Sequence, residues 1–150
     1  GPAALTGIGQ PGRKLRPADV ALLGVRDVDP GENELIARAG IWTRSTDEWR
    51  AGGIRETLDE AMARLTAPGI DAIHVSFDLD VLDPAVLPGT GTAVPNGLSM
   101  EEARLVIEHL RAWDAPVRSI DVVELNPALD PSGRSIANAS ALLHDLLSGD

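Results

Sequence analysis

The sequence predicts an α/β fold in which a mostly parallel sheet is flanked by helices. Short apolar runs of strand length alternate along the chain with longer segments of helical periodicity, which is typical of parallel α/β sheets. Three of the apolar runs lead directly into acidic residues, as strands do when their carboxyl ends form a functional edge. The length of 150 residues is that of one domain of ordinary size.

Four segments are predicted to be strands: residues 19–25, 41–43, 73–77 and 117–125. The first is a continuous apolar run of the kind that is buried on both faces of a parallel sheet. The second is brief, and the last is stopped by Asn126 and Pro127.

Four further segments are predicted to be helices: residues 32–39, 54–65, 99–110 and 136–147. Gly40 suits the position just past the end of the first, and residues 67–69 end the second. Ser99 and Glu102 have the spacing of a capping box, which marks the start of the third. The fourth is predicted to close the fold with an apolar stripe formed by Ile136, Leu143 and Leu147.

The composition excludes several classes of function. At 43% hydrophobic residues the chain is too apolar to be disordered, yet it has no unbroken apolar run that would span a membrane. A formal net charge of −10 repels phosphate backbones and anionic lipid, so we expect neither nucleic acid nor a membrane as partner. The absence of cysteine excludes disulfides, thiolate metal sites and cysteine nucleophiles. No secretory signal is recognisable, and we expect a cytoplasmic protein.

Acidic residues follow the three clearest strands. The clusters are Asp27, Asp29 and Glu32, then Asp78, Asp80 and Asp83, and finally Glu124. Because the carboxyl ends of parallel strands meet at one edge of a sheet, functional groups collect there. The coincidence of three clusters carries more weight than any one of them.

Asp78 and Asp80 leave the same face of an extended chain, about 6–7 Å apart. Two carboxylates that close repel each other unless a cation or a proton lies between them. Hard oxygen ligands without cysteine suit Mg, Ca or Mn. The alternative is that aspartates at the end of a strand cap the next turn, a role for which Asp83 before Pro84 is well placed.

The other two clusters also have structural interpretations. Asp27 and Asp29 precede a turn that brings Glu32 near, and acidic residues at a helix start are favoured by the helix dipole. Glu124 lies in an apolar strand end, where an unpaired charge is costly, so Arg26 or Arg118 is a candidate partner.

A loop rich in proline, glycine and threonine, residues 83–97, follows the acidic strand end. Such a loop lets the backbone approach a ligand closely, and it lacks the Gly-Lys-Ser/Thr of a phosphate-binding loop. The three histidines show no ligand spacing, and no Ser-His-Asp arrangement follows from the sequence.

These motifs together resemble the signature of the ureohydrolases, the arginase and agmatinase family of binuclear manganese amidinohydrolases. The matching segments are residues 76–84, residues 88–92 with 97–98, residues 121–127 and residues 26–32. The resemblance covers essentially the whole chain in the right order. It implies an arginase-like three-layer α/β/α fold, of which residues 1–150 are expected to be the C-terminal part, with the N-terminal half absent.

The resemblance implies a metal centre and a catalytic role for three carboxylates. Asp78 is expected to bridge two Mn²⁺ ions, and Asp80 to bind one of them and hold the proton destined for the leaving amine. Glu124 resembles the glutamate that binds the guanidinium group.

It also implies a substrate pocket. Thr92 is expected to line this pocket. Asp29 and Glu32 are expected to hold the α-amino group of arginine, with Asp27 as a supporting neighbour, a set that favours arginine over agmatine.

The expected reaction is metal-dependent hydrolysis of L-arginine to L-ornithine and urea. Family members are longer, form trimers or hexamers, and carry further manganese ligands, including an Asp-x-His-x-Asp motif, that these 150 residues lack. We therefore expect the isolated chain to have little or no hydrolase activity. Three alternatives stay open. The first is an agmatinase or related guanidino- or formimino-hydrolase, and the second is a non-catalytic truncated paralogue that acts by association. The third is an acidic α/β domain whose carboxylates are only surface charge.

Overall fold

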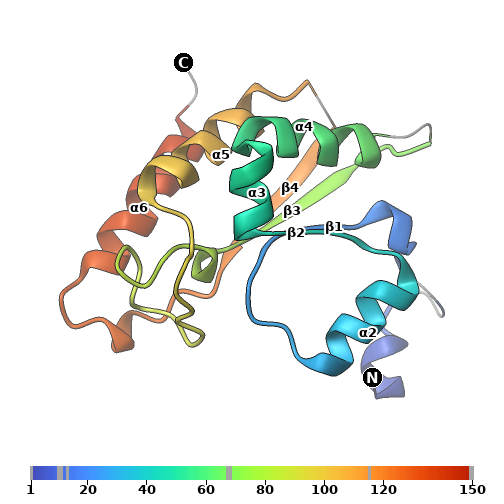
Figure 1. Ribbon diagram of the computed structural model, residues 1–150, viewed down its shortest axis with the longest axis horizontal. Coiled ribbons are helices and arrows are strands. Elements are labelled where there is room, and N and C mark those ends of the chain that lie inside the picture. Colours follow the sequence, from blue (N-terminus) through green and yellow to red (C-terminus); the bar gives the residue numbers. More distant parts are fainter. Residues whose placement is uncertain (1, 10–11, 13, 67–68, 115, 149–150) are drawn as a thin grey trace.

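Two pairs of parallel strands form the centre of the fold (Figure 1). The computed structural model describes residues 2–9, 12, 14–66, 69–114 and 116–148. Strand β1 (Ala21–Val25) pairs with β2 (Trp42–Ser45), and β3 (Ile73–Asp78) pairs with β4 (Val117–Val123). Both pairs are parallel, as predicted, although the described strands form two sheets rather than one continuous sheet.

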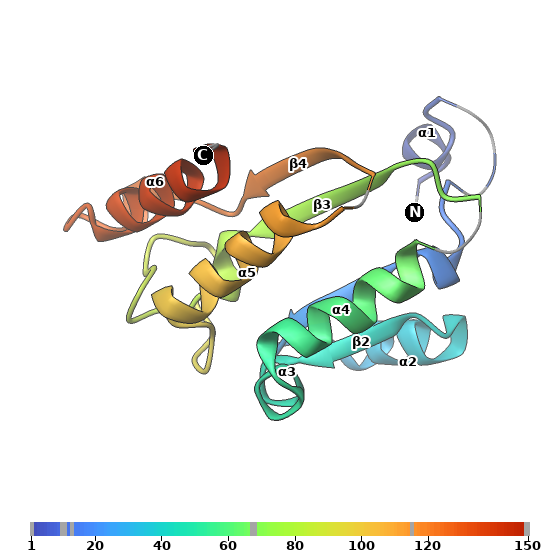
Figure 2. The ribbon, with the colours of Figure 1, turned by 90° about the horizontal axis from the view of Figure 1, so that it is seen from above.

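Helices lie beside each of the two strand pairs (Figure 2). The longer helices are α2 (Pro30–Ala39), α3 (Thr46–Gly52), α4 (Ile54–Leu65), α5 (Met100–Ala112) and α6 (Arg134–Leu147). Short elements are α1 (Ala3–Thr6), η1 (Pro17–Asp19), η2 (Leu79–Val81) and η3 (Pro127–Leu129). Helix α5 packs between α4 and α6, so the three helices line one side of the strands. None of the described helices is long and apolar enough to cross a membrane.

Local sequence signals set most of these boundaries. The Glu102 amide donates to Ser99 Oγ at 3.1 Å and the Ser99 amide donates to Glu102 Oε2 at 2.8 Å, which confirms the predicted capping box. Gly40 ends α2 in the left-handed conformation with φ 70°, also as predicted. Helix α4 has the predicted bounds, while residues 67–68 of its predicted stop lie outside the described residues.

Several predicted boundaries differ from the structure. The first strand begins at Ala21 because residues 17–19 form a 3₁₀ turn, and β4 stops at Val123 because Glu124 has φ 65°. The brief strand predicted at 41–43 runs from Trp42 to Ser45. Pro30 occupies the first turn of α2, which therefore starts before residue 32. Helix α3 was not predicted, although Ser45 caps it.

The prediction for the apolar stripe of α6 is wrong. This helix buries Ser135, Ala139 and Leu142, and the three residues predicted to face the core are exposed: Ile136 by 47%, Leu143 by 36% and Leu147 by 78%. The buried face is rotated because α6 packs through small residues that allow close approach to the loop after β3.

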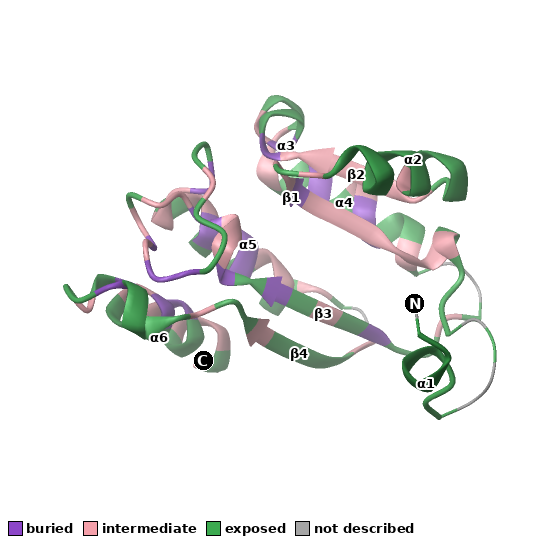
Figure 3. Ribbon diagram, turned by 90° about the horizontal axis from the view of Figure 1, so that it is seen from below, coloured by how far each residue is buried: buried purple, intermediate pink, exposed green. Residues whose placement is uncertain are grey.

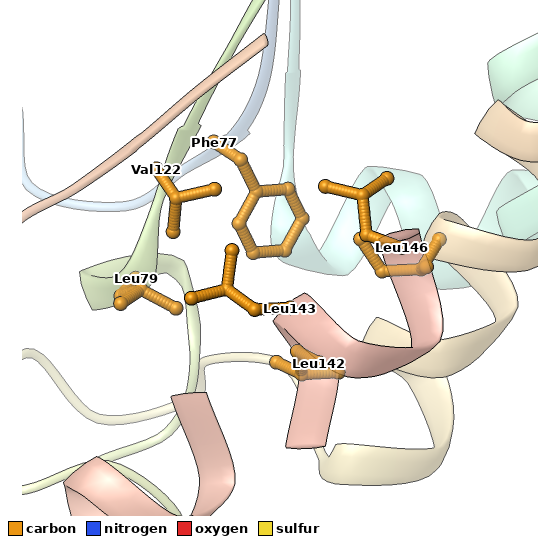
Figure 4. A pocket seen from close by; sticks show the side chains of 7 residues that line it. Phe77, Leu79, Val122, Leu142, Leu143 and Leu146 are labelled. Atoms are coloured by element: carbon orange, nitrogen blue, oxygen red, sulfur yellow. The ribbon is translucent and has the colours of Figure 1, made fainter. Parts of the chain in front are cut away.

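The main hydrophobic core lies between β3–β4 and helices α5 and α6. Phe77 and Val122 of the strands pack against Leu142 and Leu146 of α6 (Figure 4). Leu79, at the end of β3, is 2% exposed and belongs to the same core. This packing fixes the strand end from which the acidic residues emerge.

The other face of β3–β4 is polar and exposed (Figure 3). His74 Nδ1 lies 2.8 Å from Ser119 Oγ, and His74 Nε2 lies 3.2 Å from Asp121 Oδ2. Sequence reasoning missed this contact because it depends on the register of two strands that are 45 residues apart.

Candidate active site

Asp78 and Asp80 lie on either side of a buried anchor at the end of β3. Asp78 is the last residue of the strand and accepts a hydrogen bond from Ser76 Oγ at 3.1 Å. Leu79 packs into the core, and Asp80 follows in the 3₁₀ turn η2, half-buried. The sequence placed Asp78 correctly at a strand end. The prediction that both aspartates leave the same face of an extended chain is wrong, because β3 ends at Asp78 and Asp80 lies in a 3₁₀ turn.

Glu124 joins these two aspartates at the carboxyl edge of β3–β4. Asp78 pairs with Val123 in the ladder, so the next residue of that chain segment is Glu124. The pKa of Asp80 is raised by burial first, and then by the negative charges of Asp78 and Glu124. Asp80 therefore lies within electrostatic range of both Asp78 and Glu124. Such a cluster attracts a cation.

Arg26 is held by backbone carbonyls and not by Glu124. Its Nη1 donates to the carbonyl oxygens of Gly24 and Val81, both at 3.1 Å, and its Nη2 donates to that of Asp80. Burial lowers the pKa of this guanidinium, while the charge of Asp80 raises it. Among the described ion pairs none involves Glu124, so neither arginine considered from the sequence pairs with it.

The cluster after β1 forms the exposed start of α2. The Asp29 amide donates to Glu32 Oε2 at 3.3 Å in a capping box, which confirms the structural interpretation of these two residues. Asp27 is exposed in the preceding loop. Both capping carboxylates are exposed. The substrate role that the resemblance implies for Asp29 and Glu32 stays a prediction.

The loop 83–97 is closed on itself by Asp83. This carboxylate accepts hydrogen bonds from the amides of Ala85 and Asn96 at 2.9 Å and of Gly97 at 3.2 Å. The first of these amides is the main reason that the pKa of Asp83 is lowered. The interpretation of Asp83 as a turn-capping residue is therefore confirmed.

Arg50 of α3 ties the end of this loop to α5. Its guanidinium donates to Asn96 Oδ1 at 2.8 Å, to the Gly97 carbonyl at 2.7 Å, and to both carboxylate oxygens of Glu102. Sequence reasoning missed Arg50, since no motif links residues about 50 positions apart.

The start of the loop is anchored by the segment after β4. The Gly89 amide donates to Ser135 Oγ at 2.7 Å, and the Asn126 amide donates to the Gly89 carbonyl at 2.7 Å. Thr92 is exposed between the two anchored ends of the loop. The structure therefore places Thr92 on a loop that is held at both ends, and the role of Thr92 in lining a substrate pocket stays a prediction.

Asp78 and Asp80 have the ligand chemistry that a manganese ion requires, but they are too few to complete its coordination. Asp78 and Asp80 offer the oxygen ligands that Mn²⁺ accepts. Within the described ranges, no group of three or more histidine, aspartate or glutamate side chains is placed to hold a metal ion. A complete site would need further donors.

Comparison with known proteins decides the family. A family model described as "Arginase family" matches residues 10–149. The chain belongs to the arginase family.

Arginase relatives match nearly the whole chain. The arginase of Bacillus caldovelox is 38% identical over 146 residues, which are 97% of this chain and 48% of that protein. The crystal structure of arginase from Bacillus subtilis superposes with a TM-score of 0.91 at 32% identity, covering 100% of this chain and 50% of the other. Formimidoylglutamase from Bacillus subtilis gives a TM-score of 0.79 at 25% identity, covering 87% and 41%.

Membership of the arginase family confirms the resemblance and the arginase-like α/β fold. The chain spans about half the length of the relatives that it matches.

Proposed function

We propose that this chain supplies part of the active site of an enzyme that hydrolyses a guanidino C–N bond, with L-arginine as substrate and L-ornithine and urea as products. One observation carries the proposal: Asp78, Asp80 and Glu124 converge at the carboxyl edge of β3–β4 in a chain of the arginase family.

Asp78 and Asp80 would be ligands of a centre of two Mn²⁺ ions that residues outside these 150 complete. The incomplete donor set of the described residues supports this division. When bound, such ions supply a water molecule of lowered pKa. Asp80, half-buried beside two other carboxylates, would hold at a carboxylate oxygen the proton that goes to the leaving amine.

Glu124 would orient the guanidinium group by paired, charge-assisted hydrogen bonds. No ion pair engages this side chain among the described residues, and it is exposed. A bound guanidinium would offset the repulsion between Glu124 and Asp80.

The loop after β1 would recognise the other end of the substrate. Asp29 and Glu32, with Asp27 beside them, carry exposed negative charge toward which an α-amino group is attracted. Thr92, on the anchored loop, would line the pocket between the two ends.

The same fold also accommodates a related reaction. The similarity to formimidoylglutamase supports a formimino- or other guanidino-hydrolase, such as an agmatinase, as the alternative. A non-catalytic role by association is favoured by a separate observation, since each described strand has a neighbour on one side alone. The longer family members would assemble as trimers or hexamers.

The test is an NMR titration of the isotopically labelled chain with L-arginine, without metal and then with MgCl₂. Mg²⁺ accepts the same oxygen ligands as Mn²⁺ and, being diamagnetic, leaves the signals near the site observable. We expect shifts at Glu124, Thr92 and Asp29, weaker shifts with agmatine, and loss of the Glu124 response in Glu124→Gln. Urea assays on matched samples that contain MnCl₂ should show no turnover. Absence of any arginine response, with or without Mg²⁺, would overturn the assignment of the substrate.

A further inference from the structure

We propose that Arg26 is a positioning residue that fixes the Asp78–Asp80 turn relative to the loop after β1. This inference rests on the proposed function of those aspartates. It adds a residue that contacts neither substrate nor metal but sets where the metal-binding carboxylates lie.

The contacts of Arg26 span two strand pairs that share no ladder. One hydrogen bond goes back to the Gly24 carbonyl on β1, and two go to the carbonyls of Asp80 and Val81 in η2. The partners in η2 are 54 and 55 residues away in sequence. A single guanidinium therefore joins the end of one pair to the turn at the end of the other.

The backbone next to this contact is close-packed. A Cβ atom added to Gly24 would lie 2.5 Å from Val81 Cγ2, so β1 and η2 approach each other without space for a side chain. The hydrogen bonds of Arg26 and the close packing at Gly24 thus both lie where β1 meets η2. Displacement of η2 would cost both the hydrogen bonds and this packing.

The chemistry of arginine suits this role better than that of lysine. A guanidinium carries several donors in a fixed planar fork, whereas a lysine ammonium is a single point on a flexible stem. Arg26 uses two nitrogens for three carbonyls. Replacing Arg26 with lysine would keep the positive charge near Asp80 but remove the planar set of donors. That substitution therefore distinguishes an effect of the hydrogen bonds from an effect of the charge.

The position of Arg26 in the sequence gives the contact its functional meaning. The next residue is Asp27, which opens the loop proposed to bind the α-amino end of the substrate. The carbonyls that Arg26 holds belong to Asp80 and its neighbour, at the proposed metal end. Arg26 therefore sets the distance between the two ends of the site.

The experiment compares Arg26→Lys and Arg26→Gln with the unaltered chain, below the unfolding temperature of each. Without metal, amide hydrogen exchange is measured at Val81 and Leu82. With MnCl₂, affinity is measured from the electron paramagnetic resonance signal of free Mn²⁺. We expect faster exchange in both variants and an affinity loss of about 10- to 100-fold, the usual effect of disturbing residues behind metal ligands.

The matched controls are Arg104→Lys and Arg104→Gln. Arg104 is an exposed arginine of α5 whose Nε lies 3.2 Å from Asp145, so these variants should leave exchange in η2 and Mn²⁺ affinity unchanged. Unchanged exchange at Val81 and Leu82 in both Arg26 variants would overturn the proposal. So would wild-type Mn²⁺ affinity in Arg26→Lys, because charge alone would then explain the contact.

A failure of the proposed function would give a different experimental result from a failure of the role proposed for Arg26. If Mn²⁺ binding is the same in Asp78→Asn, Asp80→Asn and the unaltered chain, the two aspartates are not the metal ligands. The exchange measurement still decides whether Arg26 fixes the turn, because it is made without metal.

Discussion

Gly97 lies at the end of the loop 83–97, where the loop packs against the backbone of Leu82 and Asp83. A Cβ atom there would lie 2.3 Å from the Asp83 amide nitrogen and 2.3 Å from the Leu82 carbonyl carbon. Both neighbours are backbone atoms that also take part in the Leu82–Leu98 bridge, so they have little freedom to move. Glycine is needed here for close approach, not for a left-handed conformation.

We expect Gly97→Ala to lower the free energy of unfolding by about 1–3 kcal/mol, the usual range for overpacking. Gly91→Ala is the matched control in the same loop, because nothing lies within 4 Å of a Cβ there. That variant should stay within about 0.5 kcal/mol of the unaltered chain. Urea unfolding followed by circular dichroism measures both, and equal midpoints would contradict the prediction.

Asp130 is a second residue whose environment yields a prediction. Its carboxylate is buried and accepts from the amide of Ser132 at 3.0 Å, from Ser132 Oγ at 2.5 Å and from the Ser135 amide at 2.7 Å. The Ser132 hydroxyl, followed by the Ser135 amide, holds the pKa of Asp130 well below its ordinary value. Ser135 in turn anchors the loop through Gly89.

The pH dependence follows from the direction of that shift. A pKa that is lower in the folded chain means that ionised Asp130 stabilises the fold above its unfolded pKa of about 4. This stabilisation is lost as the pH falls through the folded pKa. We therefore expect Asp130→Asn to lower the midpoint of urea unfolding at pH 7, and the difference from the unaltered chain to narrow below pH about 4. A difference that does not depend on pH would contradict it; Asp71→Asn, at an exposed position, is the control.

At the scale of elements, α5 connects the loop of the site to the core. Its capping box satisfies the first amides of the helix, and its buried residues, Ala103, Val106 and Ile107, belong to the main hydrophobic core. Ser99→Ala should lower the free energy of unfolding by about 1 kcal/mol, the usual value of a lost N-cap. Ser140→Ala on the exposed face of α6 is the control and should cause no loss. Equal stability of the two variants would show that the cap is redundant.

Elements with a strong local signal were predictable, and contacts between distant elements were not. The Ser99 capping box, Gly40 and the strand before Asp78 are encoded within a few residues, and the structure has all three. Helix α3 had the local signal of Ser45 and Glu48 but spans seven residues, too few for a clear periodicity.

The part of the candidate site that the sequence predicted is the part carried by contiguous motifs. Asp78, Asp80 and Glu124 end adjacent strands, so parallel pairing was enough to bring them together. Arg26 and Arg50 act on carbonyls and side chains about 50 residues away. Such contacts follow from tertiary packing, which no short pattern in the sequence records. The wrong face predicted for α6 has the same origin.

At the scale of the whole molecule, two opposing properties govern association. Each of the described strands leaves one side unpaired, and α6 exposes an apolar stripe of Ile136, Leu143 and Leu147. Unpaired strands and apolar stripes favour contact with another chain. A formal net charge of −10 works against contact between two copies.

The balance between these properties predicts self-association that depends on salt. Salt at 1 M shortens the screening length to about 3 Å, which removes the repulsion between copies but leaves apolar contact and strand pairing in place. We therefore expect sedimentation velocity to show a larger share of dimer or higher species at 1 M NaCl than at 0.05 M. Ile136→Lys should reduce that share if the stripe of α6 takes part, and Leu129→Lys, at an exposed leucine outside α6, is its control. A monomer at both salt concentrations and at every protein concentration would mean that the unpaired edges are blunted, and the role by association would lose its support.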